Sequence, residues 1–98
     1  MLIRIVRMQF TESGAEEFLE IFRANMIAIR HFEGCTHLEL LKDPDEPYVF
    51  TTLSYWNGPQ FLENYRRSEL FSNVWGRVKP LFAERTQAFS VERFIEVA

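Results

Sequence analysis

Four side chains in this sequence have the chemistry needed to bind and polarise a small organic molecule: Arg7, Trp56, Asn57 and Tyr65. Their guanidinium, indole, amide and phenol groups all donate hydrogen bonds, so in a dry cavity they could stabilise negative charge that develops on a bound molecule. Neighbouring aromatic rings could stack on a planar ligand. Three of these residues are the candidate catalytic groups: Arg7, Trp56 and Tyr65. Further ligand contacts are predicted at Asn57, Trp75, Phe71 and Phe22.

Most of these residues also have a structural interpretation. Trp56 and Trp75 stand at strand and helix spacing, which is typical of residues in a protein core. Asn57 precedes a predicted helix, where asparagine is a common N-cap. The sequence leaves both interpretations open.

Arg7 stands among apolar residues of a predicted strand, so its charge requires either a partner or a ligand. Side chains alternate along a strand, which places Arg7 on the same face as Ile3 and Ile5. We expect the guanidinium to project from the end of this apolar stripe toward a pocket between sheet and helices. Its counter-charge would be Glu39 or an anionic ligand.

No metal site and no cofactor site are predicted. His37 and Glu39 share one strand face and could form an acid–base pair, but two ligands do not complete a metal site, and a hydrogen-bonded structural pair is the simpler interpretation. The acidic turn at 43–46 lacks the spacing and the central glycine of a calcium loop.

The first half of the chain predicts two strands around a helix, and then a third strand. Residues 2–10 are rich in β-branched side chains, and a capping box of Ser13 and Glu16 predicts a helix that ends at Gly34. Residues 35–43 and 48–56 are also strand-like, and the proline-punctuated turn between them predicts a hairpin.

The second half predicts two short helices and a last strand. Asn57 is the expected N-cap of a helix that runs through about residue 67, and Ser68 caps the next helix. Pro80 is expected to kink this second helix or to mark its end. Residues 86–95 return to strand-like composition.

This order predicts an α+β, ferredoxin-like βαββαβ fold with a four-stranded antiparallel sheet and its helices on one face. The first and last strands have apolar residues on both faces, although the helices can cover only one. An antiparallel sheet that met water on its bare face would be polar there. We therefore expect the bare face to pack against a second copy of the chain, which makes the protein a homodimer.

The composition narrows the class of protein further. A chain of 98 residues is expected to form a single domain over residues 1–98, and its net charge of −3 disfavours a nucleic-acid partner. No apolar run is long enough to cross a bilayer, so no membrane partner is expected. One cysteine and no export signal predict a cytoplasmic location.

The segment from Val49 to Phe71 carries a more specific pattern: a strand that ends in Tyr55 and Trp56, a capped helix, and then Ser68 at the next helix start with Phe71 after it. This pattern, with the Glu33–Gly34 turn, resembles the antibiotic biosynthesis monooxygenase family of dimeric α+β barrels. The resemblance implies a pocket between sheet and helices in each subunit. It also implies cofactor-independent oxidation of quinol-like or polycyclic phenolic small molecules by O2.

The sequence departs from relatives of this fold in a way that bears on function. Many family members carry a histidine where this chain has Tyr65, and haem-degrading members have Asn, Trp and an iron-ligating His where this chain has Arg7, Tyr65 and Trp75. Haem degradation is therefore disfavoured. The alternative to an oxygenase is a dimer of the same fold that binds a small ligand or serves a structural role without turnover.

Overall fold

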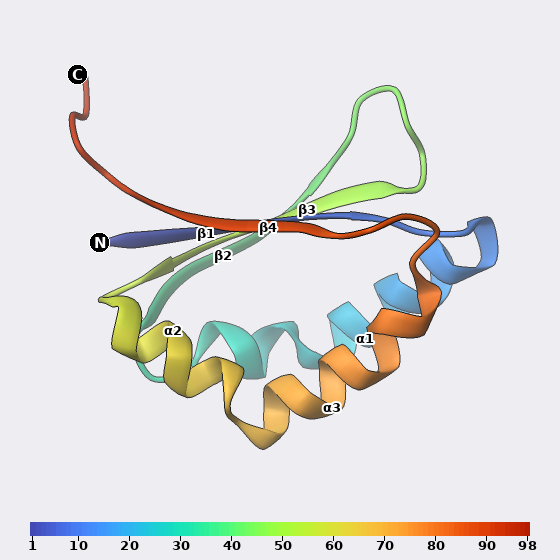
Figure 1. Ribbon diagram of the computed structural model, residues 1–98, viewed down its shortest axis with the longest axis horizontal. Coiled ribbons are helices and arrows are strands. Elements are labelled where there is room, and N and C mark those ends of the chain that lie inside the picture. The colour runs from blue at the N-terminus through green and yellow to red at the C-terminus, as the bar shows by residue number, and fades with distance from the viewer.

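The computed structural model describes all residues from 1 to 98. Its elements follow in this order: β1 (Leu2–Gln9), α1 (Glu12–Arg30), β2 (Cys35–Lys42), β3 (Val49–Trp56), α2 (Pro59–Arg66), α3 (Glu69–Val78), the short 3-10 helix η1 (Lys79–Leu81) and β4 (Gln87–Glu92). The strands form one antiparallel sheet in the order β2-β3-β1-β4, and all helices lie on one face of it (Figure 1). The predicted ferredoxin-like βαββαβ fold is confirmed.

The covered face of the sheet holds the main core. Met8 of β1 and Phe50 of β3 are direct partners, and both pack with Phe18 of α1. The Phe10 ring, only 2% exposed, stacks on Phe18 at a centroid distance of 4.3 Å. Burial of these large apolar side chains is the main stabilising contribution to this side of the molecule.

The start of α1 differs from the prediction. Thr11, not Ser13, is the N-cap, because its hydroxyl accepts a hydrogen bond from the Gly14 N–H at 3.0 Å. Helix α1 therefore begins at Glu12, and Ser13 lies inside its first turn, so the predicted Ser13–Glu16 capping box is wrong. Ser68 caps α3 as predicted, since its hydroxyl accepts from the Phe71 N–H.

The end of α1 also lies earlier than predicted. The helix ends at Arg30, and Gly34 serves the following turn instead, with a φ of 89°. A Cβ at Gly34 would lie 2.3 Å from the Phe61 side chain, so glycine is required both for conformation and for space. This contact fixes the α1–β2 turn against α2.

The last strand is shorter than the predicted range 86–95. It spans Gln87–Glu92, because Glu92 already pairs with Leu2, the first residue of β1. The ladder with β1 ends at this pair, and the tail that follows extends to the helix-free side of the sheet (Figure 1). Phe94 and Ile95 are 93% and 74% exposed.

Two predicted features of turns are confirmed. Strands β2 and β3 form the expected hairpin, and Asp43 Oδ1 accepts hydrogen bonds from the backbone of Asp45 and Glu46 in the turn. These bonds hold the pKa of Asp43 below its ordinary value. Pro80 marks the end of α3, since the chain passes into the 3-10 helix η1 there.

Candidate functional site

A cavity of about 360 Å³ lies between the covered face of the sheet and the helices. Its walls come from all four strands and from α1, α2 and α3. Fourteen of its 19 lining residues are hydrophobic, and the other five are Arg4, Thr52, Ser54, Arg66 and Thr86. A largely apolar cavity with a few polar groups is the usual form of a small-molecule site.

An unbroken series of rings forms one wall of the cavity. Trp56 stacks on Tyr65 at 5.1 Å, Tyr65 meets Phe71 edge-on at 5.2 Å, and Phe71 stacks on Trp75 at 5.8 Å between ring centroids. All four line the cavity, as does Phe22 of α1. Sequence reasoning thus predicted five of the lining residues. The wall presents flat apolar surface, which suits a planar ligand.

Trp56 is both a core residue and a lining residue of the cavity. It is 1% exposed, and its indole Nε1 donates a hydrogen bond to Ser54 Oγ at 3.0 Å inside the sheet face. The indole N–H is therefore already used within the protein. Trp56 contributes a ring surface to the cavity, and its N–H holds the ring in place.

Tyr65 is the phenol of the cavity. Burial, with a smaller contribution from the nearby Cys35, raises the pKa of Tyr65 to about 12. The phenol therefore stays protonated at neutral pH. It can donate a hydrogen bond to a ligand oxygen, but it cannot serve as a ready proton acceptor.

The guanidinium in the cavity belongs to Arg4 and not to Arg7. Arg7 does share a face with Ile3 and Ile5, as expected, but this is the helix-free face, because Arg4, Val6 and Met8 line the cavity. The prediction that Arg7 points into the pocket is wrong. The alternation that put Val6 and Met8 opposite Arg7 was itself a signal for Arg4, two residues before Val6 in the same stripe.

Arg4 is half-buried on β1, the strand that lies between β3 and β4 in the sheet. Its Nη1 donates a hydrogen bond to Ser90 Oγ of β4 at 3.2 Å. Burial, followed by the positive charge of Arg66, lowers the pKa of Arg4. Arginine nevertheless stays charged at neutral pH, so the cavity wall carries a cation whose protein partner is a neutral hydroxyl.

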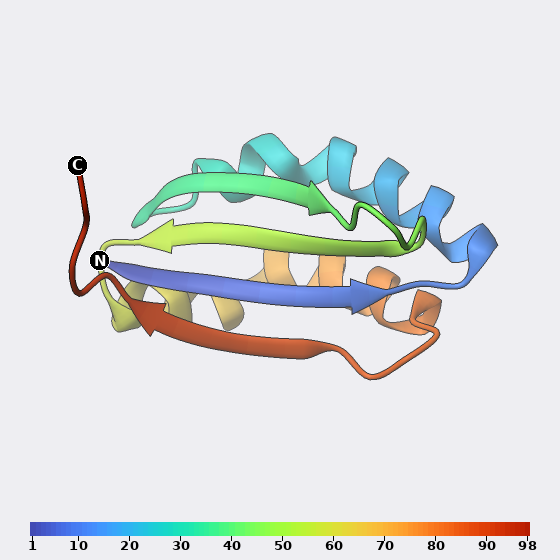
Figure 2. The ribbon, with the colours of Figure 1, turned by 90° about the horizontal axis from the view of Figure 1, so that it is seen from above.

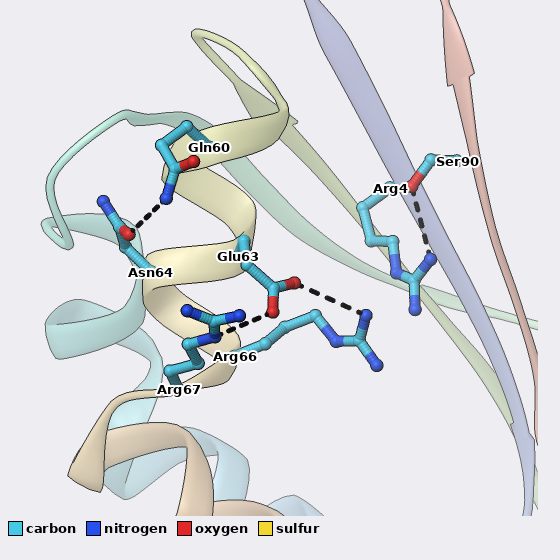
Figure 3. A network of polar contacts seen from close by, with 7 residues as sticks. All are labelled: Arg4, Gln60, Glu63, Asn64, Arg66, Arg67 and Ser90. Atoms are coloured by element: carbon cyan, nitrogen blue, oxygen red, sulfur yellow. Dashed lines mark hydrogen bonds and ion pairs between the residues drawn. The ribbon is translucent and has the colours of Figure 1, made fainter.

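Arg66 is a second cavity residue that sequence reasoning missed. It extends from α2 toward the sheet and toward Arg4 (Figure 3). Glu63 lies 4.0 Å from Arg66 but only 3.0 Å from Arg67, so the carboxylate pairs more closely with Arg67. No local pattern distinguishes Arg66, the last residue of α2, from Arg67, because only the tertiary position of the helix sets which one meets the cavity.

Asn57 lies outside the cavity. It is exposed, and its backbone N–H donates to the Gly34 carbonyl at 2.8 Å, which joins the two turns at this end of the sheet. The N-cap of α2 is Gly58, without a side-chain hydrogen bond. Asn57 is thus neither the predicted N-cap nor a lining residue.

Thr86, just before β4, supplies the most isolated polar atom of the cavity. Its Oγ1 is buried and has no hydrogen-bond partner in the chain. An unpaired buried hydroxyl costs roughly 1–3 kcal/mol, so this group is a natural contact for a polar atom of a ligand.

The sequence of this chain matches the profile of one protein family, described as antibiotic biosynthesis monooxygenase, over residues 1–74. The chain belongs to this family. None of the curated proteins matches it significantly.

Solved structures share the fold of this antibiotic biosynthesis monooxygenase domain at low sequence identity. One described as an antibiotic biosynthesis monooxygenase superposes with a TM-score of 0.90 at 16% identity, covering 97% of this chain and 100% of the other. A conserved protein from Methanosarcina mazei Go1 gives 0.89 at 19% identity, with 96% and 94% covered. A protein from Pseudomonas aeruginosa gives 0.84 at 20% identity, also with 96% and 94% covered.

The histidines of this family member lie outside the cavity. His37 is on the helix-free face, where its Nε2 is 3.1 Å from Glu39 Oε2, and His31 ends α1. No imidazole, thiolate or carboxylate is among the lining residues, so the cavity offers neither a histidine nor a cysteine to haem iron. No cluster of three or more metal-binding side chains occurs anywhere in the chain, and no helix combines the length and apolarity that a membrane span requires.

Proposed function

We propose that this domain binds a flat phenolic or quinol-like molecule in the cavity and oxidises it with O2, without a bound cofactor. The observation that carries the proposal is the ring wall from Trp56 to Trp75, which faces the same cavity as the Arg4 guanidinium. The wall would hold an aromatic ring, and the cation would hold its oxygen. Family membership supports an oxygenase, since the family is described as monooxygenase.

The proposed reaction balances without an external reductant. An electron-rich aromatic anion donates electrons to O2, a carbon–oxygen bond forms at a ring carbon that bears hydrogen, and the O–O bond then breaks. One oxygen atom becomes a quinone carbonyl. The other leaves as water with the two hydrogens removed from the substrate, so O2 accepts all the electrons that the substrate loses.

The residues of the chain would contribute binding and charge stabilisation. Arg4 would stabilise the aromatic oxyanion and the negative charge that passes to oxygen, while the protonated Tyr65 donates a hydrogen bond. The apolar walls would keep water from the reacting atoms and so strengthen both interactions.

Binding without turnover is the second candidate function. It is favoured by the absence of a carboxylate or imidazole among the lining residues, since such a group is the usual general base of an enzyme. An oxygen electrode separates the two functions. With naphthohydroquinone and anthrone-like compounds, an oxygenase consumes O2 above the protein-free rate and inserts one of its oxygen atoms into the quinone product, whereas a binding protein leaves that rate unchanged.

We also propose that the protein is a homodimer formed through the helix-free face of the sheet. Leu41, Phe89 and Val91 are 44%, 50% and 43% exposed on this face, and the apolar tail extends to the same side. A second copy would bury this surface. Light scattering at micromolar concentration should report twice the chain mass of 11.7 kDa. A folded species of the single-chain mass would contradict the proposal.

A further inference from the structure

The polar end of the cavity carries two positive charges and no negative one. Arg4 from β1 and Arg66 from α2 both line it, and Figure 3 shows their side chains converging from the sheet and the helix. No aspartate or glutamate is among the lining residues. A cavity of this composition has a positive potential that its apolar walls screen poorly.

Neither guanidinium is neutralised by the protein in the way that a structural arginine usually is. The side-chain partner of Arg4 is the uncharged Ser90 hydroxyl, at 3.2 Å. Arg66 is 4.0 Å from Glu63, whose other oxygen is taken by Arg67 at 3.0 Å. One carboxylate outside the cavity therefore serves both Arg66 and Arg67, and none serves Arg4.

The positive charge of Arg66 also acts on Arg4. Burial and the charge of Arg66 both lower the pKa of Arg4, which means that each disfavours the charged form. A bound anion would compensate both effects, because it supplies the missing counter-charge and forms charge-assisted hydrogen bonds with guanidinium donors. These two cations therefore favour an anionic ligand over a neutral one of the same shape.

The cavity also cannot produce this anion itself. Its phenol, Tyr65, has a pKa raised to about 12, and no lining side chain is a carboxylate or imidazole. We propose that the site selects aromatic molecules that are already ionised at neutral pH, such as acidic hydroxyquinones or enols, and discriminates against their neutral analogues. The proposal rests on the ligand-binding part of the proposed function, but not on turnover.

A pair of probes that differ in ionisation tests this selectivity. The probes are 2-hydroxy-1,4-naphthoquinone, a vinylogous acid that is anionic at neutral pH, and 2-methoxy-1,4-naphthoquinone, its neutral methyl ether. Titration calorimetry of the full chain should give a dissociation constant roughly ten- to a hundredfold lower for the acid, as expected for one or two charge-assisted hydrogen bonds. Acidification that protonates the hydroxy probe should reduce its affinity to that of the ether.

Three methionine variants show whether the two arginines cause the selectivity. R4M and R66M should each remove most of the preference for the acid with little effect on the ether. R77M is the matched control, because Arg77 is an exposed arginine of α3 that does not line the cavity and does not pair with Glu63, and it should keep the preference. If R4M fails to fold, R66M still provides the test, since the Arg66 side chain is 49% exposed and tolerates change.

The outcomes separate this proposal from the proposed function. If the chain binds both probes equally, or if R77M changes the preference as much as R66M does, ionic selectivity is overturned while the cavity remains a ligand site. If neither probe binds, the selectivity and the ligand site are both overturned. If the acid is preferred but no compound causes O2 uptake, selectivity stands and the oxygenase function fails.

Discussion

Two arginines of β1 have different surroundings because they lie on opposite faces of the sheet. Arg4 and Arg7 are three positions apart in β1, yet Arg4 lines the cavity and Arg7 lies on the helix-free face beside Thr51 and Gln87 (Figure 2 shows that face toward the viewer). Apolar residues accompany both arginines. The difference lies in what covers each face: helices enclose a cavity over Arg4, while the chain itself provides no cover over Arg7.

This comparison shows the limit of an apolar pattern. Alternation assigns residues to two faces, but it does not say which face the helices cover when both are apolar. Helix packing decides that, and it depends on Phe18 and Phe50 meeting Met8. A cation next to apolar neighbours therefore marks a site only after the covered face is known.

The largest effect is expected from a charge at the centre of the helix-free face. Ile5 lies between Leu53 and Phe89 there, so Ile5→Asp places a carboxylate inside the proposed interface. We expect loss of the dimer and of the folded chain, since obligate dimers often lack a stable single subunit. Light scattering and circular dichroism measure the two losses.

Ile27→Asp is the matched control for this change, because Ile27 is 62% exposed on α1, away from the sheet. It should behave like the unmodified chain. A folded dimeric Ile5→Asp protein would mean that the helix-free face is not the interface.

The next largest effect is expected in the pH dependence of the free energy of unfolding, and it comes from Tyr65 on the helix-covered side of the sheet. Burial raises the pKa of Tyr65 to about 12, from an ordinary value of 10.0. The unfolded chain therefore loses this proton first, so stability is full below pH 10 and declines between pH 10 and 12 by about 2–3 kcal/mol. Urea unfolding at pH 9 and 11.5 should show the decline in the unmodified chain and a smaller one in Tyr65→Phe. An identical decline in both proteins would place the cause elsewhere.

Replacing each arginine of β1 by methionine tests the comparison directly. Arg4→Met should weaken binding of an aromatic anion by roughly ten- to a hundredfold, which is about 1.5–3 kcal/mol for a charge-assisted hydrogen bond. Arg7→Met should leave the dissociation constant unchanged, because Arg7 does not line the cavity. Calorimetry of both variants decides, and weaker binding by Arg7→Met would restore the sequence-based prediction.

The smallest effect is expected at Thr86. Thr86→Val removes a buried hydroxyl that has no partner in the chain, so we expect the free protein to gain up to about 1 kcal/mol of stability. The same change should weaken, by a few-fold, a ligand whose carbonyl accepts a hydrogen bond from that hydroxyl. Thr51→Val, on the helix-free face, is the control and should not alter ligand binding. Destabilisation by Thr86→Val would show that the hydroxyl has a structural role.

The sequence was sufficient for the fold and for the ring wall of the cavity. Trp56, Tyr65, Phe71 and Trp75 follow strand and helix periodicity, and these local patterns survive in the folded chain. The two cavity arginines, Arg4 and Arg66, were not predicted, because which arginine faces the cavity depends on long-range packing. Arg66 was indistinguishable from its neighbour until the position of α2 was known.

Local competition explains the errors at helix ends. Thr11 and Ser13 are both good N-cap residues, and Thr11 is the N-cap of α1 because its hydroxyl reaches the Gly14 N–H. The last strand is shorter than the predicted range 86–95 for a different reason, since its only neighbour in the sheet, β1, begins at Leu2. Neither the N-cap of α1 nor the end of the last strand can be predicted from residue propensities alone.

The central position of β1 has a consequence for how the protein is made. This strand is synthesised before both of its sheet neighbours, β3 and β4, and β4 follows it by about 80 residues in the sequence (Leu2–Gln9 against Gln87–Glu92). The β2–β3 hairpin can form while synthesis continues, whereas β1 must wait for distant partners, which is a slow kind of folding step. Arg4 can therefore meet Ser90 only after β4 has been synthesised, so the hydrogen bond between them forms later than the contacts within the β2–β3 hairpin.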